Sequence, residues 1–159
     1  MVKFPHILLS VSLGCAAYSQ PLDTLRSHLI EVEGYRHFVY KDTRGNSTIG
    51  IGHKLIHGEV YQNIGSNQIE SLFISDINIA KKEALRLVPS FNSQPQQVKI
   101  IIISLIFNLG PTGFSKFHRF RSALEKKNYK LTAVELSDSL WANQVPNRAK
   151  LYISILNKL

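Results

Sequence analysis

The sequence predicts an α+β protein that is mostly helical. Apolar residues recur at helical spacing through most of the chain, and one short region, residues 38–49, has the composition of two strands around a polar turn. With 159 residues the chain is long enough for one domain with a sizeable core. We expect a small N-terminal lobe with a β-hairpin, a long connecting helix and an all-helical C-terminal lobe.

The N-terminal lobe is expected to span residues 20–65 and to begin with a helix. Its apolar positions have the spacing of one helical face, at Leu22, Leu25, Leu29 and Val32. Gly34 then supplies a C-terminal stop after Glu33. Residues 38–49 form the predicted hairpin, and a third short strand is expected near residues 59–61.

The connecting helix is predicted over residues 66–88, with Ser66 as its N-cap and Pro89 as its stop. The C-terminal lobe, residues 89–159, then has an apolar run from Val98 to Leu109 that is too long for a strand and indicates a central buried helix. Further helices are predicted over residues 116–126, 131–141 and 146–157.

Residues 1–19 differ from the rest and read as a signal peptide or a signal-anchor segment, ahead of a domain over residues 20–159. Lys3 precedes an apolar stretch, residues 7–17, and small residues follow. This layout predicts a secreted or periplasmic protein, or one tethered to the membrane if the segment is not cleaved, with transient membrane contact through it. The alternative is a buried N-terminal helix.

The net charge of +8 favours a negatively charged partner, such as nucleic acid, anionic lipid or an acidic cell-wall polymer. Nucleic acid has only the charge in its favour, because no predicted helix carries a clustered basic face, so we expect no such partner. The single cysteine, Cys15, lies in the N-terminal segment. His53 and His57 sit in a glycine-flanked turn without a metal-binding pattern, so we expect no metal there. We also expect no cofactor and a monomer.

Glu33 is predicted at the C-terminus of a helix, where the dipole presents partial negative charge. That environment, with partial burial in a cleft, favours a protonated carboxyl group, which can act as a general acid. The alternative is a solvated glutamate at a helix end. Asp42 and Thr48 flank the hairpin turn, so a short loop would bring them together to hold one water molecule. The alternatives are a turn aspartate bonded to local backbone and an ordinary strand threonine.

Together these groups would suit inverting glycoside hydrolysis, in which an acid and a water-activating carboxylate lie about 6.5–9.5 Å apart. The stretch from Glu33 through Asp42 and Thr48 to Ile49-Gly50-Ile51-Gly52-His53 resembles the catalytic segment of the T-even phage type of lysozyme, glycoside hydrolase family 24. Two later segments agree: Phe107-Asn108-Leu109-Gly110 with Thr112-Gly113, and Trp141-Ala142-Asn143-Gln144 with Pro146-Asn147-Arg148-Ala149-Lys150. The resemblance covers about residues 22–159, which is nearly all of the chain after the N-terminal segment.

The resemblance implies a lysozyme-like fold and a muramidase that cleaves the β-1,4 bond between N-acetylmuramic acid and N-acetylglucosamine in peptidoglycan. It assigns Glu33 as the acid, and Asp42 with Thr48 as the residues that position the attacking water. The role could be phage lysis as an endolysin, cell-wall catabolism or antimicrobial defence. A rival reading is a non-catalytic cationic wall-binding protein, which intact Glu33, Asp42 and Thr48 weigh against.

The resemblance also implies supporting residues. Arg148 matches an arginine that pairs with the catalytic glutamate, and His53 with Asp76 matches a structural salt bridge. Substrate contacts are expected from Phe107, Asn108 and Lys54. Phe107 could instead be a core residue, and Arg148 a solvated helix charge. Lys54 replaces an apolar cleft residue; Val32, Phe120 and Glu135 are further departures that bear on substrate preference.

Overall fold

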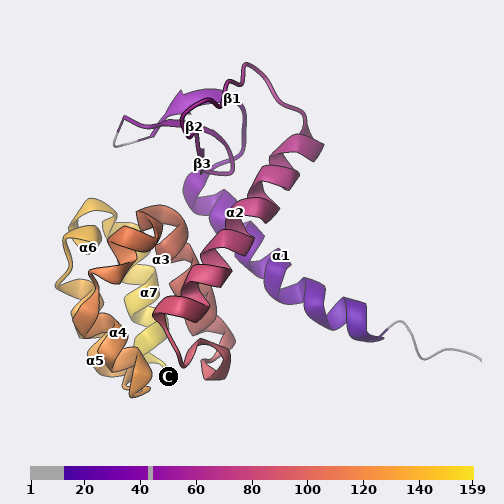
Figure 1. Cartoon of the computed structure of the whole chain (residues 1–159). Helices are drawn as coiled ribbons and strands as arrows, with labels where there is room; N and C mark the ends of the chain where they lie inside the picture. The colour runs from indigo at the N-terminus through magenta and orange to yellow at the C-terminus, as the bar shows by residue number, and fades with distance from the viewer. Residues whose placement is uncertain (1–12, 43–44) are drawn as a thin grey trace, which may run out of the picture.

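The structure, a computed structural model, describes residues 13–42 and 45–159, with side chains from residue 23 onward. It opens with helix α1 (Leu13–Glu33), followed by an antiparallel sheet of order β1-β2-β3, formed by β1 (Arg36–Lys41), β2 (Ser47–Gly50) and β3 (His53–Lys54). Helix α2 (Ser66–Leu87) runs from the sheet to the helical part of the molecule (Figure 1). The α+β fold class predicted from the sequence is confirmed.

The helical part contains a short 3-10 turn, η1, and five α-helices. They are η1 (Phe91–Ser93), α3 (Gln96–Ser115), α4 (His118–Glu125), α5 (Tyr129–Ser137), α6 (Leu140–Gln144) and α7 (Pro146–Asn157). Figure 1 shows these helices gathered at one end of α2, with the sheet at the other end. The core helix is α3, whose apolar composition follows from burial: Val98, Ile101, Ile102, Leu105 and Ile106 are all nearly inaccessible to solvent. By length and composition alone α3 could also cross a membrane.

Helix α1 begins earlier than predicted. It starts at Leu13 rather than Leu22, so the predicted boundary after residue 19 falls inside a continuous helix. Residues 1–12 of the proposed signal segment lie outside the described residues. The C-terminal end agrees with the prediction, because Gly34 has φ +84° and its N–H donates to the carbonyl of Ile30.

The predicted third strand near residues 59–61 is wrong. Gly50 and Gly52 have φ of +66° and +72°, so they turn the chain back at once and place the third strand at His53–Lys54. Residues 59–61 are irregular, and beyond them Asn63 forms an isolated bridge with Phe38.

In the rest of the chain, several helix boundaries differ from those predicted from the sequence. The N-cap of α2 is Gly65 rather than Ser66. Helix α3, which contains the apolar run from residue 98, continues past that run to Ser115, with a kink at Gly110 (φ 72°, ψ 165°). The helix predicted over residues 131–141 is two helices, because the Ser139 side chain accepts a hydrogen bond from the N–H of Ala142 and starts α6.

Candidate active site

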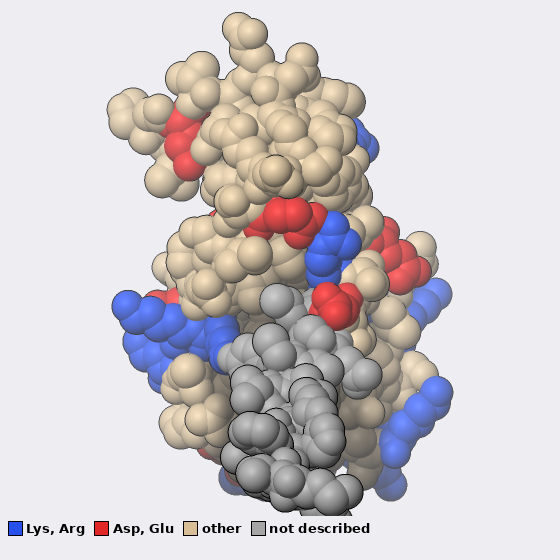
Figure 2. Space-filling view, turned by 90° about the vertical axis from the view of Figure 1, so that its right-hand side faces the viewer, with Lys and Arg blue, Asp and Glu red and all other residues tan. Residues whose placement is uncertain are grey.

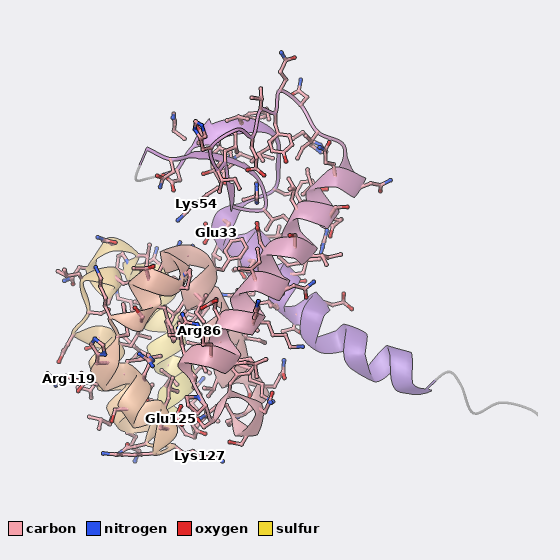
Figure 3. All side chains as sticks on the ribbon, viewed as in Figure 1. Glu33, Lys54, Arg86, Arg119, Glu125 and Lys127 are labelled. Atoms are coloured by element: carbon pink, nitrogen blue, oxygen red, sulfur yellow. The ribbon has the colours of Figure 1, made fainter. Side chains whose placement is uncertain are left out.

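A cavity of about 1310 Å³ lies between the sheet and the helical part of the molecule. Its walls include six of the residues singled out from the sequence: Glu33, Asp42, Thr48, Lys54, Asn108 and Arg148. Figure 3 shows Glu33 at the end of α1 and Lys54 on the sheet, both facing the boundary between the two parts. Phe107 is not among the lining residues; it is half-buried and packs against the hydrophobic core.

Glu33 is the last residue of α1 and is held by two side chains from the helical part. Arg148, near the start of α7, donates from Nη1 to Glu33 Oε1 at 2.7 Å, and Asn108 on α3 donates from Nδ2 to the same oxygen at 3.3 Å. Arg148 also donates from Nη2 to the carbonyl of Val32 at 3.1 Å. Only 9% of the arginine side chain and 18% of the Glu33 side chain are exposed, so this ion pair is well shielded from water.

Gly52 brings the sheet against Glu33. A Cβ atom at this position would lie 3.1 Å from Glu33 Cβ and 3.0 Å from Phe107 Cε1, closer than normal van der Waals contact. With φ of +72°, the backbone also has a conformation that residues other than glycine avoid. Glycine is therefore required here both for the turn and for the close approach to the Glu33 side chain.

Asp42 and Thr48 are linked through Asn46 rather than directly. Asp42 accepts hydrogen bonds from the Asn46 N–H and from Asn46 Nδ2, both at 2.8 Å. The Thr48 hydroxyl donates to the Asn46 carbonyl at 3.2 Å, and Thr48 is only 2% exposed. The local turn bonding weighed as the alternative for Asp42 is thus present, although Asp42 and Thr48 also line the cavity.

His53 lies between two carboxylates. Its Nδ1 is 2.8 Å from Asp76 Oδ2 on α2, and its Nε2 is 3.2 Å from Glu59 Oε2. The hydrogen bond to Asp76 is the main reason that the pKa of His53 is raised above its ordinary value, and Glu59 adds to this effect. The pKa of Glu59 is lowered, first by a hydrogen bond from the N–H of Ile56 and then by His53. This cluster fastens the sheet to α2.

A polar network that the sequence did not reveal lies behind Asn108. Trp141 Nε1 donates to Asn108 Oδ1 at 3.0 Å, and its ring stacks on Tyr152 with centroids 5.8 Å apart. The Tyr152 hydroxyl bonds with Ser104 Oγ at 2.5 Å and with His28 Nε2 at 2.6 Å. Burial raises the pKa of Tyr152 to about 12 and lowers that of His28, so both are neutral near pH 7.

One signal for this network was present in the sequence, because Trp141 is the only tryptophan of the chain. The other members of the network come from three other helices, α1, α3 and α7, and could not be paired from spacing alone. Among the residues that the structure describes, no group of three His, Cys, Asp or Glu side chains is arranged to hold a metal ion.

The fold is mostly helical with one small sheet, and carboxyl groups from α1 and from the hairpin line the same cavity. These features define the class of lysozyme-like glycoside hydrolases. The chain belongs to the phage lysozyme family, whose model matches residues 30–152.

Curated relatives agree with this assignment. "Probable T4-type lysozyme 2" of Dictyostelium discoideum is 30% identical over 159 aligned residues, covering 84% of this chain and 94% of that protein. "Probable T4-type lysozyme 1" of the same organism is 27% identical and covers 78% of this chain and 88% of its own length. "Peptidoglycan hydrolase gp36" of Pseudomonas phage phiKMV is 25% identical over 80% of this chain, but over only 14% of its own length. The chain is a glycoside hydrolase of the lysozyme type.

Proposed function

We propose that the chain cleaves the β-1,4 bond between N-acetylmuramic acid and N-acetylglucosamine in peptidoglycan, with inversion at the anomeric carbon. The observation that carries this proposal is that Glu33, Asp42 and Thr48 line one cavity from two different elements. Family membership supports the reaction class, and the name of the phage relative supports peptidoglycan as the substrate.

In the proposed reaction, Glu33 donates a proton to the oxygen of the leaving sugar. Both hydrogen bonds to its carboxyl group, from Arg148 and Asn108, end on Oε1. In the acid form of Glu33 that the reaction requires, the proton would sit on Oε2, the oxygen on which neither of these two hydrogen bonds ends. Arg148 and Asn108 thereby fix the orientation of the acid.

On the other side of the cleaved bond, Asp42 and Thr48 would hold the attacking water. As the bond to the leaving oxygen breaks, the water oxygen attacks the anomeric carbon of the muramic acid residue and its proton passes to the Asp42 carboxylate. Asn46 supports both groups, since it bonds to the Asp42 carboxylate and accepts from the Thr48 hydroxyl. This arrangement predicts a product of inverted configuration.

The cellular setting is also a proposal. We infer that the protein acts outside the cytoplasm on a bacterial cell wall, after export by its N-terminal segment or tethered through it, and that it acts as a monomer. The positive net charge supports this proposal, because peptidoglycan carries many carboxylates.

Purified peptidoglycan digested by the wild type and by Glu33→Gln tests the proposed reaction. The wild type is expected to release fragments with new reducing-end N-acetylmuramic acid, identified by mass spectrometry, and NMR of fresh product should show the α-anomer first. Glu33→Gln should fold normally, as circular dichroism would show, and lose at least about 1000-fold in kcat, since it cannot donate the proton. Near-normal turnover by Glu33→Gln would contradict the role of the acid, and an initial β-anomer would contradict inversion. Wall binding without release of fragments would identify a pure binding protein instead.

A further inference from the structure

Lys54 differs from the other basic residues of the cavity in its surroundings. Six lysine and arginine side chains line the cavity: Arg36, Lys41, Lys54, Lys116, Arg119 and Arg148. Four of these residues are exposed, so water screens their charges, and only Lys54 and Arg148 are half-buried. Arg148 is paired with the Glu33 carboxyl group, whereas no ion pair among the described residues includes Lys54.

The sheet register directs Lys54 into the cleft. Lys54 is the cross-strand partner of Thr48, so the two side chains lie on the same face of the sheet. The preceding residue, His53, points to the opposite face, as successive strand residues do. His53 takes both nearby carboxylates, those of Asp76 and Glu59. On this strand His53 therefore points away from the cavity and is paired with two carboxylates. Lys54 points into the cavity and has no carboxylate partner among the described residues.

The hydrogen bond that Lys54 makes in this structure can be replaced by one to a ligand. Its Nζ donates to the main-chain carbonyl of Asn108 at 2.9 Å, close to the kink at Gly110, where the helical hydrogen-bond pattern of α3 is interrupted. An ammonium group has three donors, so two remain for a ligand in the cavity. A neutral carbonyl is also a weaker partner for the ammonium group than a carboxylate, because a full negative charge attracts the ammonium charge more strongly than a carbonyl dipole does.

The position of this cation relative to the reacting groups suggests its ligand. Asn108, whose carbonyl accepts from Lys54, donates its side-chain amide to Glu33, while Thr48 lies opposite Lys54 on the sheet. Lys54 is thus next to the proposed acid and the proposed water-holding residue. In peptidoglycan, the groups that carry negative charge near the glycan backbone are the carboxylates of the peptides attached to muramic acid.

We propose that Lys54 is a specificity-determining residue that binds a free carboxylate on the peptide substituent of muramic acid, so that amidated peptides are poorer substrates. The inference rests on the proposed function and adds to it the charge state of the preferred substrate. When the carboxylate enters, the Lys54 ammonium group gives up its hydrogen bond to the Asn108 carbonyl and donates to the carboxylate instead. No covalent bond is made or broken.

The test compares soluble peptidoglycan fragments with free peptide carboxylates and the same fragments after conversion of these carboxylates to amides. The wild type is expected to favour the free carboxylates by about tenfold in kcat/KM, which is a typical effect of one charge-assisted hydrogen bond. Lys54→Met should lose this preference by acting more slowly on the free carboxylates alone. Lys54→Arg, which keeps the charge, should retain most of it.

Lys82→Met is the matched control, because Lys82 is exposed on α2, does not line the cavity, and its replacement changes the net charge by the same amount. It should keep the wild-type preference. Equal losses on both substrates in Lys54→Met, or loss of the preference in Lys54→Arg as well, would overturn the proposal. A wild type that cleaves neither substrate would contradict the proposed function instead, and equilibrium binding of the two fragments to the wild type and Lys54→Met would still decide the role of Lys54.

Discussion

At the scale of single residues, the site depends on side chains that are fixed by contacts from distant parts of the chain. Glu33 receives hydrogen bonds from Asn108 and Arg148, which lie 75 and 115 residues away. A shielded carboxyl group with two donors on one oxygen has a defined orientation, whereas a solvated helix-end glutamate would not. The sequence alone left the solvated alternative open for an isolated glutamate, and only the resemblance to a family suggested the arginine partner.

Gly52 gives the sharpest prediction at this scale. In Gly52→Ala the new methyl group would contact Glu33 Cβ and Phe107 Cε1 at about 3 Å, so the acid must move. We expect kcat on peptidoglycan to fall at least about tenfold, since small displacements of a catalytic group can cost about a hundredfold. Unfolding should become easier by about 1–2 kcal/mol because of the positive φ.

Gly58→Ala provides the matched control for this change. Gly58 also has a positive φ, +92°, but a Cβ atom there would meet nothing within 4 Å. It should therefore lose similar stability in chemical denaturation and keep wild-type kcat. Equal activities of the two variants would show that the contact with Glu33 does not matter.

At the scale of elements, the parts of the sequence with clear local signals were predicted well. Helix α7 spans Pro146–Asn157 as expected, because proline suits the first turn of a helix and little else in the region competes. The hairpin was also predicted, from its polar turn. The third strand was missed because its position follows from the backbone angles of Gly50 and Gly52, which a composition pattern does not specify.

The candidate site was predicted in part, for similar reasons. Asp42 and Thr48 are close in sequence, so a hairpin prediction was enough to bring them together. Asn46, which connects them, was not predicted as part of the site, because its hydrogen bonds depend on the turn conformation. The stacking of Trp141 on Tyr152 depends on how α6 packs on α7, and no local pattern encodes that contact.

The link between β3 and α2 predicts a pH-dependent stability. The pKa of His53 is raised above its ordinary value of 6.5, mainly by Asp76, so the folded state holds the proton more tightly than the unfolded state. The stabilisation is fully present below about pH 6.5 and is lost as pH rises through the higher pKa of the folded protein. At acidic pH the lowered pKa of Glu59 acts in the opposite direction, because its contribution is lost as pH falls below its ordinary value of 4.5.

Urea unfolding of the wild type and His53→Gln between pH 5 and pH 9 measures this effect. The difference in unfolding free energy should be largest near pH 5–6 and shrink by on the order of 1–2 kcal/mol toward pH 9. His57→Gln, at an exposed position four residues away, serves as the control and should not show this dependence. A difference between wild type and His53→Gln that is constant with pH would mean that the charged form of His53 contributes nothing.

At the scale of the whole molecule, charge is distributed unevenly. On the face shown in Figure 2, most lysine and arginine side chains lie on the half that contains the helical part, while the sheet half is largely uncharged. The cavity lies between the two halves. The six lysine and arginine residues of the cavity wall outnumber its four aspartate and glutamate residues. The resulting positive potential would raise the local concentration of an anionic polymer without contributing to the chemical step.

This distribution predicts that salt slows the attack on intact walls. Raising the ionic strength from 0.1 M to 1 M shortens the screening length from about 10 Å to about 3 Å, so kcat/KM on intact peptidoglycan should fall severalfold. A variant with Lys82, Lys126 and Lys130 changed to glutamine tests the origin of the effect, because these residues are exposed and do not line the cavity. Its net charge is 8 − 3 = +5, and its rate should start lower and depend less on salt. On short uncharged fragments the variant and the wild type should cleave at the same rate, since the catalytic groups are unchanged. An identical salt dependence in both proteins would mean that the wall itself, rather than the surface charge of the protein, responds to salt.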